Sequence, residues 1–348
     1  MKIVVGLAST KLYLHAFKSC IRRIVAAIRH EKGTMLYVSD DSPECAEAAK
    51  RLRSELTPEW TLEHIPLAGL VSSERYKVPN QIVIARLQGE LFARARALDS
   101  DLFMNVEADV LIPSDAFRVM RWALTMPDHD GAPYYDIAMC TYPNGLFLGG
   151  HGDYQRPIAE DFMMHERQVP IQIENKHKRL VEQQKSWHEA KKVVTPKESE
   201  KMNEEMGKVL EAVRKCPPKG NIWKLNAEFG WRRRGWLDFA YPGIGKGAIV
   251  PVDWIGTGCC MLTKRALSMS DFDGYDGRGT QDLFLCWKRW NPAHLRMTAI
   301  THTVCDHVKH EVIDGKETGK YIHFQAFHET SGEGIGHLRC VQKPWVDI

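Results

Sequence analysis

The N-terminal part of the chain alternates between two hydrophobic spacings, and this alternation predicts strands separated by helices. Residues 3–7 are a continuous apolar run, which is typical of a buried strand. From Leu14 to Ile28 the apolar residues recur every three or four positions, as on one buried face of a helix. Gly33 is expected to end this helix, and residues 35–38 are expected to form the next strand.

The same order continues into a long helix and an acidic strand end. Residues 60–67 predict a third strand, and the helical spacing returns over residues 80–98. This helix leads into residues 101–113, DLFMNVEADVLIP, which indicate a buried strand that ends at two carboxylates. Strands that alternate with helices predict an α/β fold with a mixed, mainly parallel sheet flanked by helices. Further strands are expected at residues 136–142, 250–255, 259–262 and 298–306.

A change in composition interrupts this pattern. Residues 176–219 contain twelve Lys or Arg against seven Glu and no Asp, although the whole chain carries a formal charge of only +3. The segment is rich in helix formers, so it predicts a charged helical insertion in the α/β fold. A solvated helical pair, a mobile lid and a surface for an anionic partner all remain open.

Composition favours a soluble globular protein. The chain is 44% hydrophobic and 26% charged, and its nine cysteines form no CxxC pair. These features favour a reducing cytoplasm, which would be the host cytoplasm for a viral chain. The apolar run at the N-terminus is too short for a signal peptide, and no segment approaches the roughly 20 apolar residues of a membrane span.

Several carboxylates follow predicted strands, where ligands of parallel sheets bind. Glu107 and Asp109 are suited to hold Mn²⁺ or Mg²⁺ between them, and an ordinary acidic turn is the alternative. Asp40 and Asp41 could accept hydrogen bonds from a base or a ribose, or could simply cap the next helix. Arg86, on the helix at residues 80–98, either pairs along an exposed face or turns toward a diphosphate.

The second half of the chain adds a candidate base and a candidate metal ligand. Asp282 is expected in the first turn of a helix capped by Thr280, where the partial positive charge favours the ionised carboxylate of a general base. It is equally a common structural position for Asp. His307 follows the strand at residues 298–306 and could join the metal, with a surface histidine as the alternative. The glycines of the segment at residues 256–258 would allow a substrate to approach the main chain closely.

A basic aromatic stretch follows the charged segment. Arg232, Arg233 and Arg234 lie between Trp231 and Trp236. Guanidinium groups between aromatic rings can bind phosphates and stack on bases. A surface β-turn is an equally good interpretation.

Taken in order, these motifs resemble GT-A-type glycosyltransferases. The resemblance rests on YVSDDS, NVEAD, WIGTGCCMLTKRAL, GTQDLFLCW and VCDHVKH, and it covers roughly residues 1–150 and 248–310. It implies a Rossmann-like nucleotide-sugar-binding half at residues 1–150, an insertion with an acceptor-side loop at 151–247, and an acceptor and catalytic half at 248–348.

The resemblance also implies roles for individual residues. Asp40 and Asp41 match the nucleoside loop, and Arg86 is assigned to the same donor. Glu107, Asp109 and His307 match the metal ligands. Asp109 is the firmer assignment, because the first acid of the family's metal-binding triplet is usually Asp, whereas this chain has Glu107. Asp282 matches the base of inverting members. The residues expected to contact substrate are Trp254, Gly256, Thr257, Gly258 and Gln281. The implied cofactors are Mn²⁺ or Mg²⁺ and a nucleotide-sugar donor. A UDP-sugar is the expected donor.

The acceptor stays open at this stage. The Lys-rich insertion and Arg232 to Arg234 suggest an anionic acceptor, such as a hydroxymethylated pyrimidine in DNA of the kind glycosylated by bacteriophage enzymes. A glycan, a glycolipid head group or a protein would suit other members. A sugar-nucleotide nucleotidyltransferase and a non-catalytic binding module are the competing classes. The chain lacks the Gly-rich basic N-terminal loop of the first competitor.

Overall fold

The protein forms two compact units in the computed structural model. One unit comprises Met1–Asp153 with Arg233–Ile348, and the other comprises Tyr154–Arg232. The structure describes residues 1–70, 80–127, 131, 133–144, 147–148, 169–189, 195–214, 216, 249–252, 254–277, 280–313, 316–330 and 336–345.

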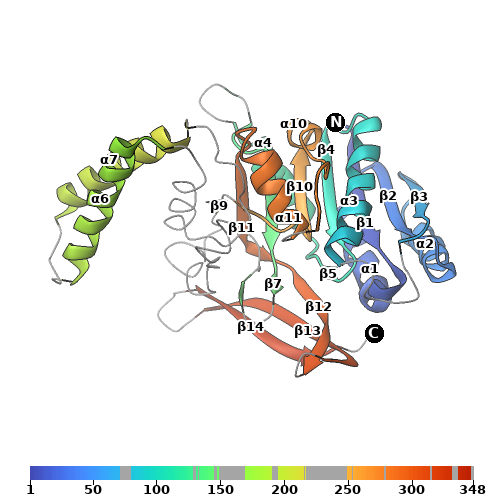
Figure 1. Ribbon diagram of the computed structural model, residues 1–348. Helices are drawn as coiled ribbons and strands as arrows, with labels where there is room; N and C mark the ends of the chain where they lie inside the picture. Colours follow the sequence, from blue (N-terminus) through green and yellow to red (C-terminus); the bar gives the residue numbers. More distant parts are fainter. Residues whose placement is uncertain are drawn as a thin grey trace. The chain divides into compact units, whose positions relative to one another are not determined.

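A central eight-stranded sheet organises the first unit (Figure 1). Its order is β3 (Trp60–Leu67), β2 (Gly33–Asp40), β1 (Ile3–Ser9), β4 (Leu102–Glu107), β10 (Cys259–Thr263), β6 (Ile137–Thr141), β11 (Met297–Val304) and β9 (Ile249–Val252). Only β10 and β9 run against the other strands. The predicted mixed, mainly parallel α/β sheet is therefore confirmed.

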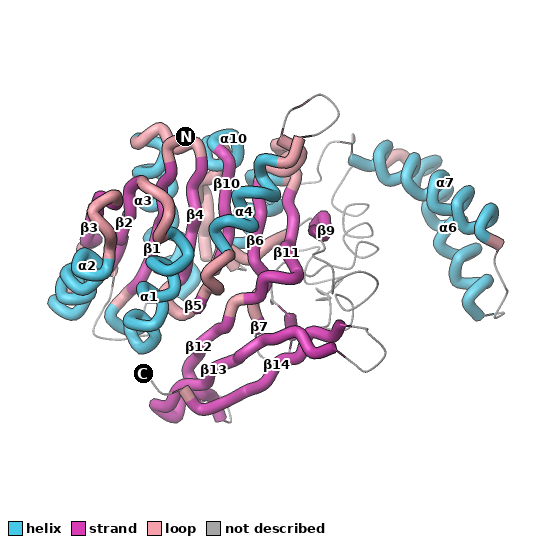
Figure 2. Tube along the Cα trace, turned by 180° about the vertical axis from the view of Figure 1, so that it is seen from behind, coloured by secondary structure: helices cyan, strands magenta, loops and turns pink. Residues whose placement is uncertain are grey.

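Helices cover both faces of this sheet. The helices α1 (Phe17–Ile28), α2 (Pro43–Glu55) and α4 (Ala116–Thr125) pack on one face, which is turned toward the viewer in Figure 2. The helices α3 (Asn80–Ala97), α10 (Lys264–Ser268) and α11 (Gln281–Phe284) pack together on the other face (Figure 1). A 3-10 turn, η1 (Lys11–Ala16), precedes α1, and a π-helical turn, η3 (Leu285–Trp290), continues α11.

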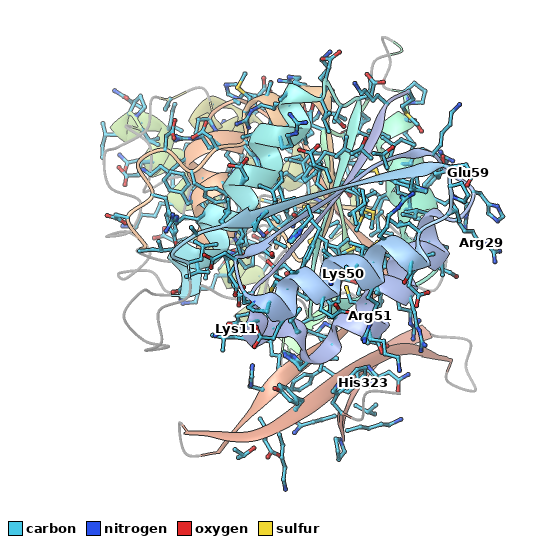
Figure 3. The ribbon with its side chains drawn as sticks, turned by 90° about the vertical axis from the view of Figure 1, so that its right-hand side faces the viewer. Lys11, Arg29, Lys50, Arg51, Glu59 and His323 are labelled. Carbon is cyan, nitrogen blue, oxygen red and sulfur yellow. The ribbon has the colours of Figure 1, made fainter. Side chains whose placement is uncertain are left out.

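A second, antiparallel sheet begins just after β4 (Figure 2). We call the end of β4 and the turn to β5, which carry Glu107 and Asp109, the acidic corner. The strands of the second sheet are β14 (Gly336–Pro344), β13 (Lys316–Thr330), β12 (Asp306–Ile313) and β5 (Val110–Leu111). A separate two-stranded sheet, β7 (Pro143–Asn144) and β8 (Phe147–Leu148), contacts it through β7. The antiparallel arrangement of β12, β13 and β14 was not predicted from the sequence. Figure 3 shows His323 on this sheet and Lys11 at the start of η1. Contact between η1 and this sheet includes His15, which stacks on Tyr321 with ring centroids 4.1 Å apart.

The second unit contains a pair of helices, α6 (Ile171–Glu189) and α7 (Pro196–Arg214), as the composition predicted. They pack through a small apolar seam of Leu180, Met202, Val209, Leu210 and Val213, all of which are buried. Together the two helices contain eight Lys or Arg and eight Glu. Of the five excess positive charges of residues 176–219, four therefore lie outside the two helices, at Lys191, Lys192, Lys215 and Lys219.

No helix within the described residues is long and apolar enough to cross a membrane.

Gly33 has a role other than the one predicted. The helix α1 ends at Ile28, and Gly33 is the first residue of β2. A Cβ atom at Gly33 would lie 2.3 Å from the carbonyl oxygen of Ile3. Glycine is therefore required for the close approach of β1 and β2, and the prediction that it ends the helix was wrong.

Gly33→Ala should destabilise the protein by about 1–3 kcal/mol, because the backbone of β1 must move to admit the methyl group. Urea unfolding followed by circular dichroism would measure this loss. Gly89→Ala on α3 is the matched control, since its Cβ would meet only Phe272 Cδ2, at 3.5 Å. The control should be neutral or up to about 1 kcal/mol more stable, because Ala is the better helix former. Equal stability of Gly33→Ala and wild type would contradict the steric argument.

Candidate active site

One edge of the central sheet collects most of the predicted site residues. The carboxyl ends of β2, β4 and β6 share this edge because the three strands run in the same direction. Asp40, Glu107 and Tyr142 lie at these ends. Gly258 joins them because β10 is antiparallel to β4, and its carbonyl accepts a hydrogen bond of 2.9 Å from the Glu107 N–H. The topology alone thus brings four distant segments together.

Glu107 lies in an environment that disfavours its charge. Its Oε1 accepts a hydrogen bond of 3.1 Å from Gln88 Nε2 of α3. Burial, together with the negative charges of Asp109 and Asp282, raises the pKa of Glu107 to about 8. A carboxyl group in this position gains from a nearby cation, because a cation offsets the repulsion from the other two acids.

Asp109 and His307, which the sequence analysis assigns to one metal site, lie side by side in the structure. The backbone pairing of β5 with β12 places His307 opposite Val110, and the Val308 N–H donates to the Asp109 carbonyl at 2.9 Å. As a result, His307 Nε2 lies 3.4 Å from Asp109 Oδ2. Burial by itself would raise the pKa of Asp109, but His307 and, at longer range, His15 hold it below its usual value.

The hydrogen bond at Nδ1 determines the tautomer of His307. Nδ1 lies 2.8 Å from the carbonyl oxygen of Pro143, which can only accept a hydrogen bond, so Nδ1 carries a proton. In the neutral ring, Nε2 then presents a lone pair to the Asp109 carboxylate. Two acceptors 3.4 Å apart are stabilised by a proton or a metal ion between them. A backbone carbonyl that orients a histidine in this way is common behind metal ligands.

Tyr142 and Gly258 form a tight wall beside this pair. The Tyr142 ring meets the His307 ring edge-on, with centroids 5.4 Å apart and an interplanar angle of 89°. A Cβ atom on Gly258 would lie 2.8 Å from the Tyr142 hydroxyl. Glycine at position 258 is therefore needed for the tyrosine to pack. Burial and the charge of Glu107 raise the pKa of Tyr142, so its hydroxyl stays protonated at neutral pH.

Two buried amides, which the sequence analysis missed, support the predicted substrate loop. Gln88 Nε2 also donates to Thr257 Oγ1 at 2.9 Å, and Asn105 Nδ2 donates to the Thr257 carbonyl at 2.6 Å. All three residues are fully buried. A signal for Gln88 was present, because it interrupts the apolar face that Ile84 and Leu91 define on the predicted helix.

Asp282 has the local structure that was predicted for it. Thr280 is the N-cap of α11, and Asp282 lies in the first turn. Asp282 is only 3% exposed, and Gln281 and Trp254 are also buried. The charge of Asp282 acts on Glu107 and Tyr142, so the candidate base lies within electrostatic range of the acidic corner. Its role in catalysis remains a prediction.

The two predicted nucleoside ligands differ in their surroundings. Both oxygens of Asp40 accept hydrogen bonds from main-chain N–H groups, Oδ2 from Lys11 at 2.8 Å and Oδ1 from Ser42 at 3.0 Å. The Ser42 side chain, together with these two main-chain N–H groups, lowers the pKa of Asp40 despite its burial. The bond from Lys11 also ties the start of η1 to the end of β2. Ser42 is the helix cap, since its hydroxyl accepts from Cys45 N. Asp41 is exposed at the same edge.

The remaining predicted residues lie apart from the acidic corner or outside the described part of the chain. Arg86 is exposed on α3, on a different side of the helix from Gln88, and it lines a cavity with Phe272 and Tyr275. The arginines 232–234 lie outside the described residues. The structure therefore adds nothing to their proposed contact with nucleic acid.

The donor atoms at this edge suit a hard divalent cation whose remaining coordination positions are filled by a bound ligand and water. No group of three His, Cys, Asp or Glu side chains within the described residues is arranged to hold a metal by itself. Asp109 and His307 supply two convergent donors, and Glu107 lies next to them in the chain. Mg²⁺ and related ions are commonly held by one or two carboxylates, with substrate phosphates and water as the other ligands. The residues present fit such an ion.

Comparison with known proteins gives only distant similarities. No protein-family model matches the chain, and no curated protein matches it. The apo form of the glycosyltransferase GlyE of Streptococcus pneumoniae TIGR4 is 15% identical over 40% of this chain and 29% of its own, with a TM-score of 0.27. This chain therefore spans less than a third of that protein.

Two further solved structures show similarity of the same order. The mannosyltransferase PcManGT of Pyrobaculum calidifontis, in complex with GDP-Man and Mn²⁺, is 13% identical over 41% of this chain and 36% of its own, with a TM-score of 0.28. A mycobacterial protein is 10% identical over 99% of this chain and 83% of its own, with a TM-score of 0.39. These scores assign no function, which has to be argued from the site itself.

Glu107→Gln should make the metal-free protein more stable at pH 8 than wild type, by a few degrees in Tm. The folded-state pKa of Glu107 is raised above that of the unfolded chain. Its stabilising contribution is therefore complete below about pH 4.3 and is lost as the pH rises toward about 8. Thermal unfolding in chelator at pH 5 and pH 8 would show a flatter pH profile for the variant.

Glu47→Gln, whose side chain is 68% exposed, is the matched control for this measurement and should follow wild type. Identical pH profiles for Glu107→Gln and wild type would contradict the raised pKa.

Proposed function

We propose that this protein is a metal-dependent glycosyltransferase of the GT-A type, which transfers a sugar from a nucleotide-sugar donor to an acceptor hydroxyl. One observation carries the proposal. An acidic strand end and a histidine almost 200 residues later in the chain meet at 3.4 Å, at the ligand-binding edge of a mainly parallel sheet. A buried carboxylate at a helix start lies within electrostatic range of both Glu107 and Tyr142.

Asp109 and His307 would hold Mn²⁺ or Mg²⁺, with Glu107 beside them. The ion, when bound, supplies positive charge to the diphosphate that leaves the sugar. The protein's part is to hold its donors in place. The Pro143 carbonyl orients His307, Gln88 holds Glu107, and the pairing of β5 with β12 fixes the spacing of the two ligands. Asp40 and Asp41, at the end of β2, would contact the nucleoside, for which we propose uridine.

Asp282 would accept the proton that the acceptor hydroxyl loses as it attacks the sugar. If the acceptor oxygen attacks from the side opposite the diphosphate, the new C–O bond forms as the bond to the diphosphate breaks, and the configuration at the anomeric carbon inverts. The segment from Trp254 to Gly258 would line the sugar, because Gly256 and Gly258 bring main chain close to the edge of the sheet. Gln281 precedes the base and would orient the same substrates.

A donor-hydrolysis screen would test the class of enzyme. The purified full-length chain is incubated with Mn²⁺ and each of a panel of UDP- and GDP-sugars, and nucleoside diphosphate release is measured. We expect release from at least one donor and its loss in chelator. Release of pyrophosphate from a nucleoside triphosphate and a sugar phosphate would instead support a nucleotidyltransferase. No release from any substrate would support a binding module.

Asp109→Ala should abolish both turnover and donor-dependent Mn²⁺ binding, because the ion would lose the carboxylate that lies 3.4 Å from His307 Nε2. Isothermal titration of Mn²⁺ in the presence of nucleoside diphosphate would measure the binding. Asp115→Ala, which removes a carboxylate that is 43% exposed and pairs with Arg118, should leave both quantities near those of wild type. Normal turnover of Asp109→Ala would remove this residue from the metal site.

Asp282→Asn should lower kcat for transfer by about 100- to 10,000-fold, the usual contribution of a general base. The Kd for the donor should change less than about twofold, because the amide keeps the shape of the side chain. Asp99→Asn is the control, since Asp99 is an exposed residue paired with Lys264. A fall in donor affinity that matches the fall in kcat would argue for a structural role of Asp282 instead.

A further inference from the structure

A cavity of about 320 Å³ lies beside α3 and outside the acidic corner. One wall is a face of α3 that includes Arg86, Gly89 and Ala93, and the facing wall is the loop at residues 271–275, with Phe272 and Tyr275. We call this cavity the α3 pocket. It lies at the lower end of the volume range of small-molecule sites, roughly 300–1,000 Å³. Nothing in the proposed chemistry uses it.

Two arginines hold the loop that forms the pocket. Arg96 donates to the carbonyls of Leu267 and Ser270, just before the loop. Arg289 donates to Asp271 Oδ1 at 2.7 Å and to the Asp273 carbonyl at 2.5 Å. The loop is therefore fixed by charged groups from two different helical segments. A wall that is rigid before binding lowers the entropy that a ligand must lose.

Aromatic rings form the apolar part of this wall. Phe272 stacks on Phe92 of α3, with centroids 5.9 Å apart and an interplanar angle of 14°. Tyr275 packs against Phe284, with centroids 5.2 Å apart. Both Phe272 and Tyr275 are only partly buried, so part of each ring faces the pocket.

Two charges of opposite sign in the pocket are uncommitted. Within the described residues, neither the Arg86 guanidinium nor the Asp273 carboxylate has a hydrogen-bond or ion-pair partner, whereas Arg96, Arg289 and Asp271 are all engaged. Arg86 offers planar donors and Asp273 offers acceptors, so together they match a ligand that carries both kinds of group.

From these features we infer that the α3 pocket binds the acceptor, and that the acceptor is a saccharide. A sugar ring has hydroxyl groups on its edges, which suit Arg86 and Asp273, and C–H faces, which suit Phe272 and Tyr275. A nucleic-acid backbone fits less well, because Asp273 would repel its phosphates. The inference rests on the proposed function and names its acceptor class.

The pocket adjoins the proposed base. Phe284, whose ring contacts Tyr275, lies two residues after Asp282 in the same helix, α11. The aromatic wall therefore packs directly on the helical turn that carries the proposed base.

Saturation-transfer NMR on the full-length chain would test the inference. The probes are the methyl glycosides of glucose, mannose and galactose, each added without donor. We expect transfer to the C–H protons of at least one glycoside. Transfer to none of the three would overturn the inference, and so would binding of the chain to duplex DNA that weakens with salt while no glycoside binds.

Variants locate the binding. Arg86→Ala and Asp273→Ala should each weaken the binding of the responsive glycoside at least tenfold, while Arg94→Ala should leave it unchanged. Arg94 lies on the same helix but pairs with Glu63 on β3, which makes it the matched control. Unchanged glycoside binding in both pocket variants would overturn the inference. A loss of nucleoside diphosphate affinity in Arg86→Ala with glycoside binding intact would also overturn it, because Arg86 would then serve the donor.

The two proposals fail separately. Donor hydrolysis by the wild-type chain depends on the acidic corner and not on the α3 pocket. Hydrolysis without glycoside binding would leave the transferase proposal in place and remove the saccharide pocket. Glycoside binding at Arg86 and Asp273 without hydrolysis of any donor would keep the pocket and remove the transferase.

Discussion

The short pairing of β5 with β12 is the interaction on which the site depends. Only two residue pairs join these strands, yet they connect the first half of the chain to its C-terminal hairpin. The pairing sets Asp109 against His307 and starts the second sheet at the end of the first. Because the contact is made by backbone hydrogen bonds, the spacing of the two side chains depends little on their own flexibility.

Negative charge at this edge is offset by hydrogen-bond donors, by an imidazole and by the charge of Lys309. Asp40 is stabilised by main-chain N–H groups, and Asp109 by the imidazole of His307. Glu107 accepts a hydrogen bond from the Gln88 amide, and the charges of Asp109 and Asp282 act on it against that of Lys309. Such an arrangement is costly in the protein alone, and the divalent cation and diphosphate of the proposed function would offset this cost.

Two buried amide side chains connect the acidic corner to the loop that precedes β10. Gln88 bridges Glu107 and Thr257, and Asn105 holds the Thr257 main chain. Polar groups that are fully buried must be hydrogen-bonded to avoid a large desolvation cost. The helix α3, the strand β4 and the loop before β10 therefore have to keep one relative position. Opposite Gln88, the same helix presents Arg86 to the α3 pocket.

The sequence by itself determined the strands and helices of the α/β sheet, because hydrophobic spacing records which face of each element is buried. It also indicated Asp109, Asp282 and His307 as chemically suited residues, through their places at strand and helix ends. Only the tertiary structure decided that Asp109 and His307 meet, that Gly33 serves strand packing, and that Gln88 supports Glu107. Each of these depends on contacts between distant segments, and local periodicity contains no information about which strands become neighbours.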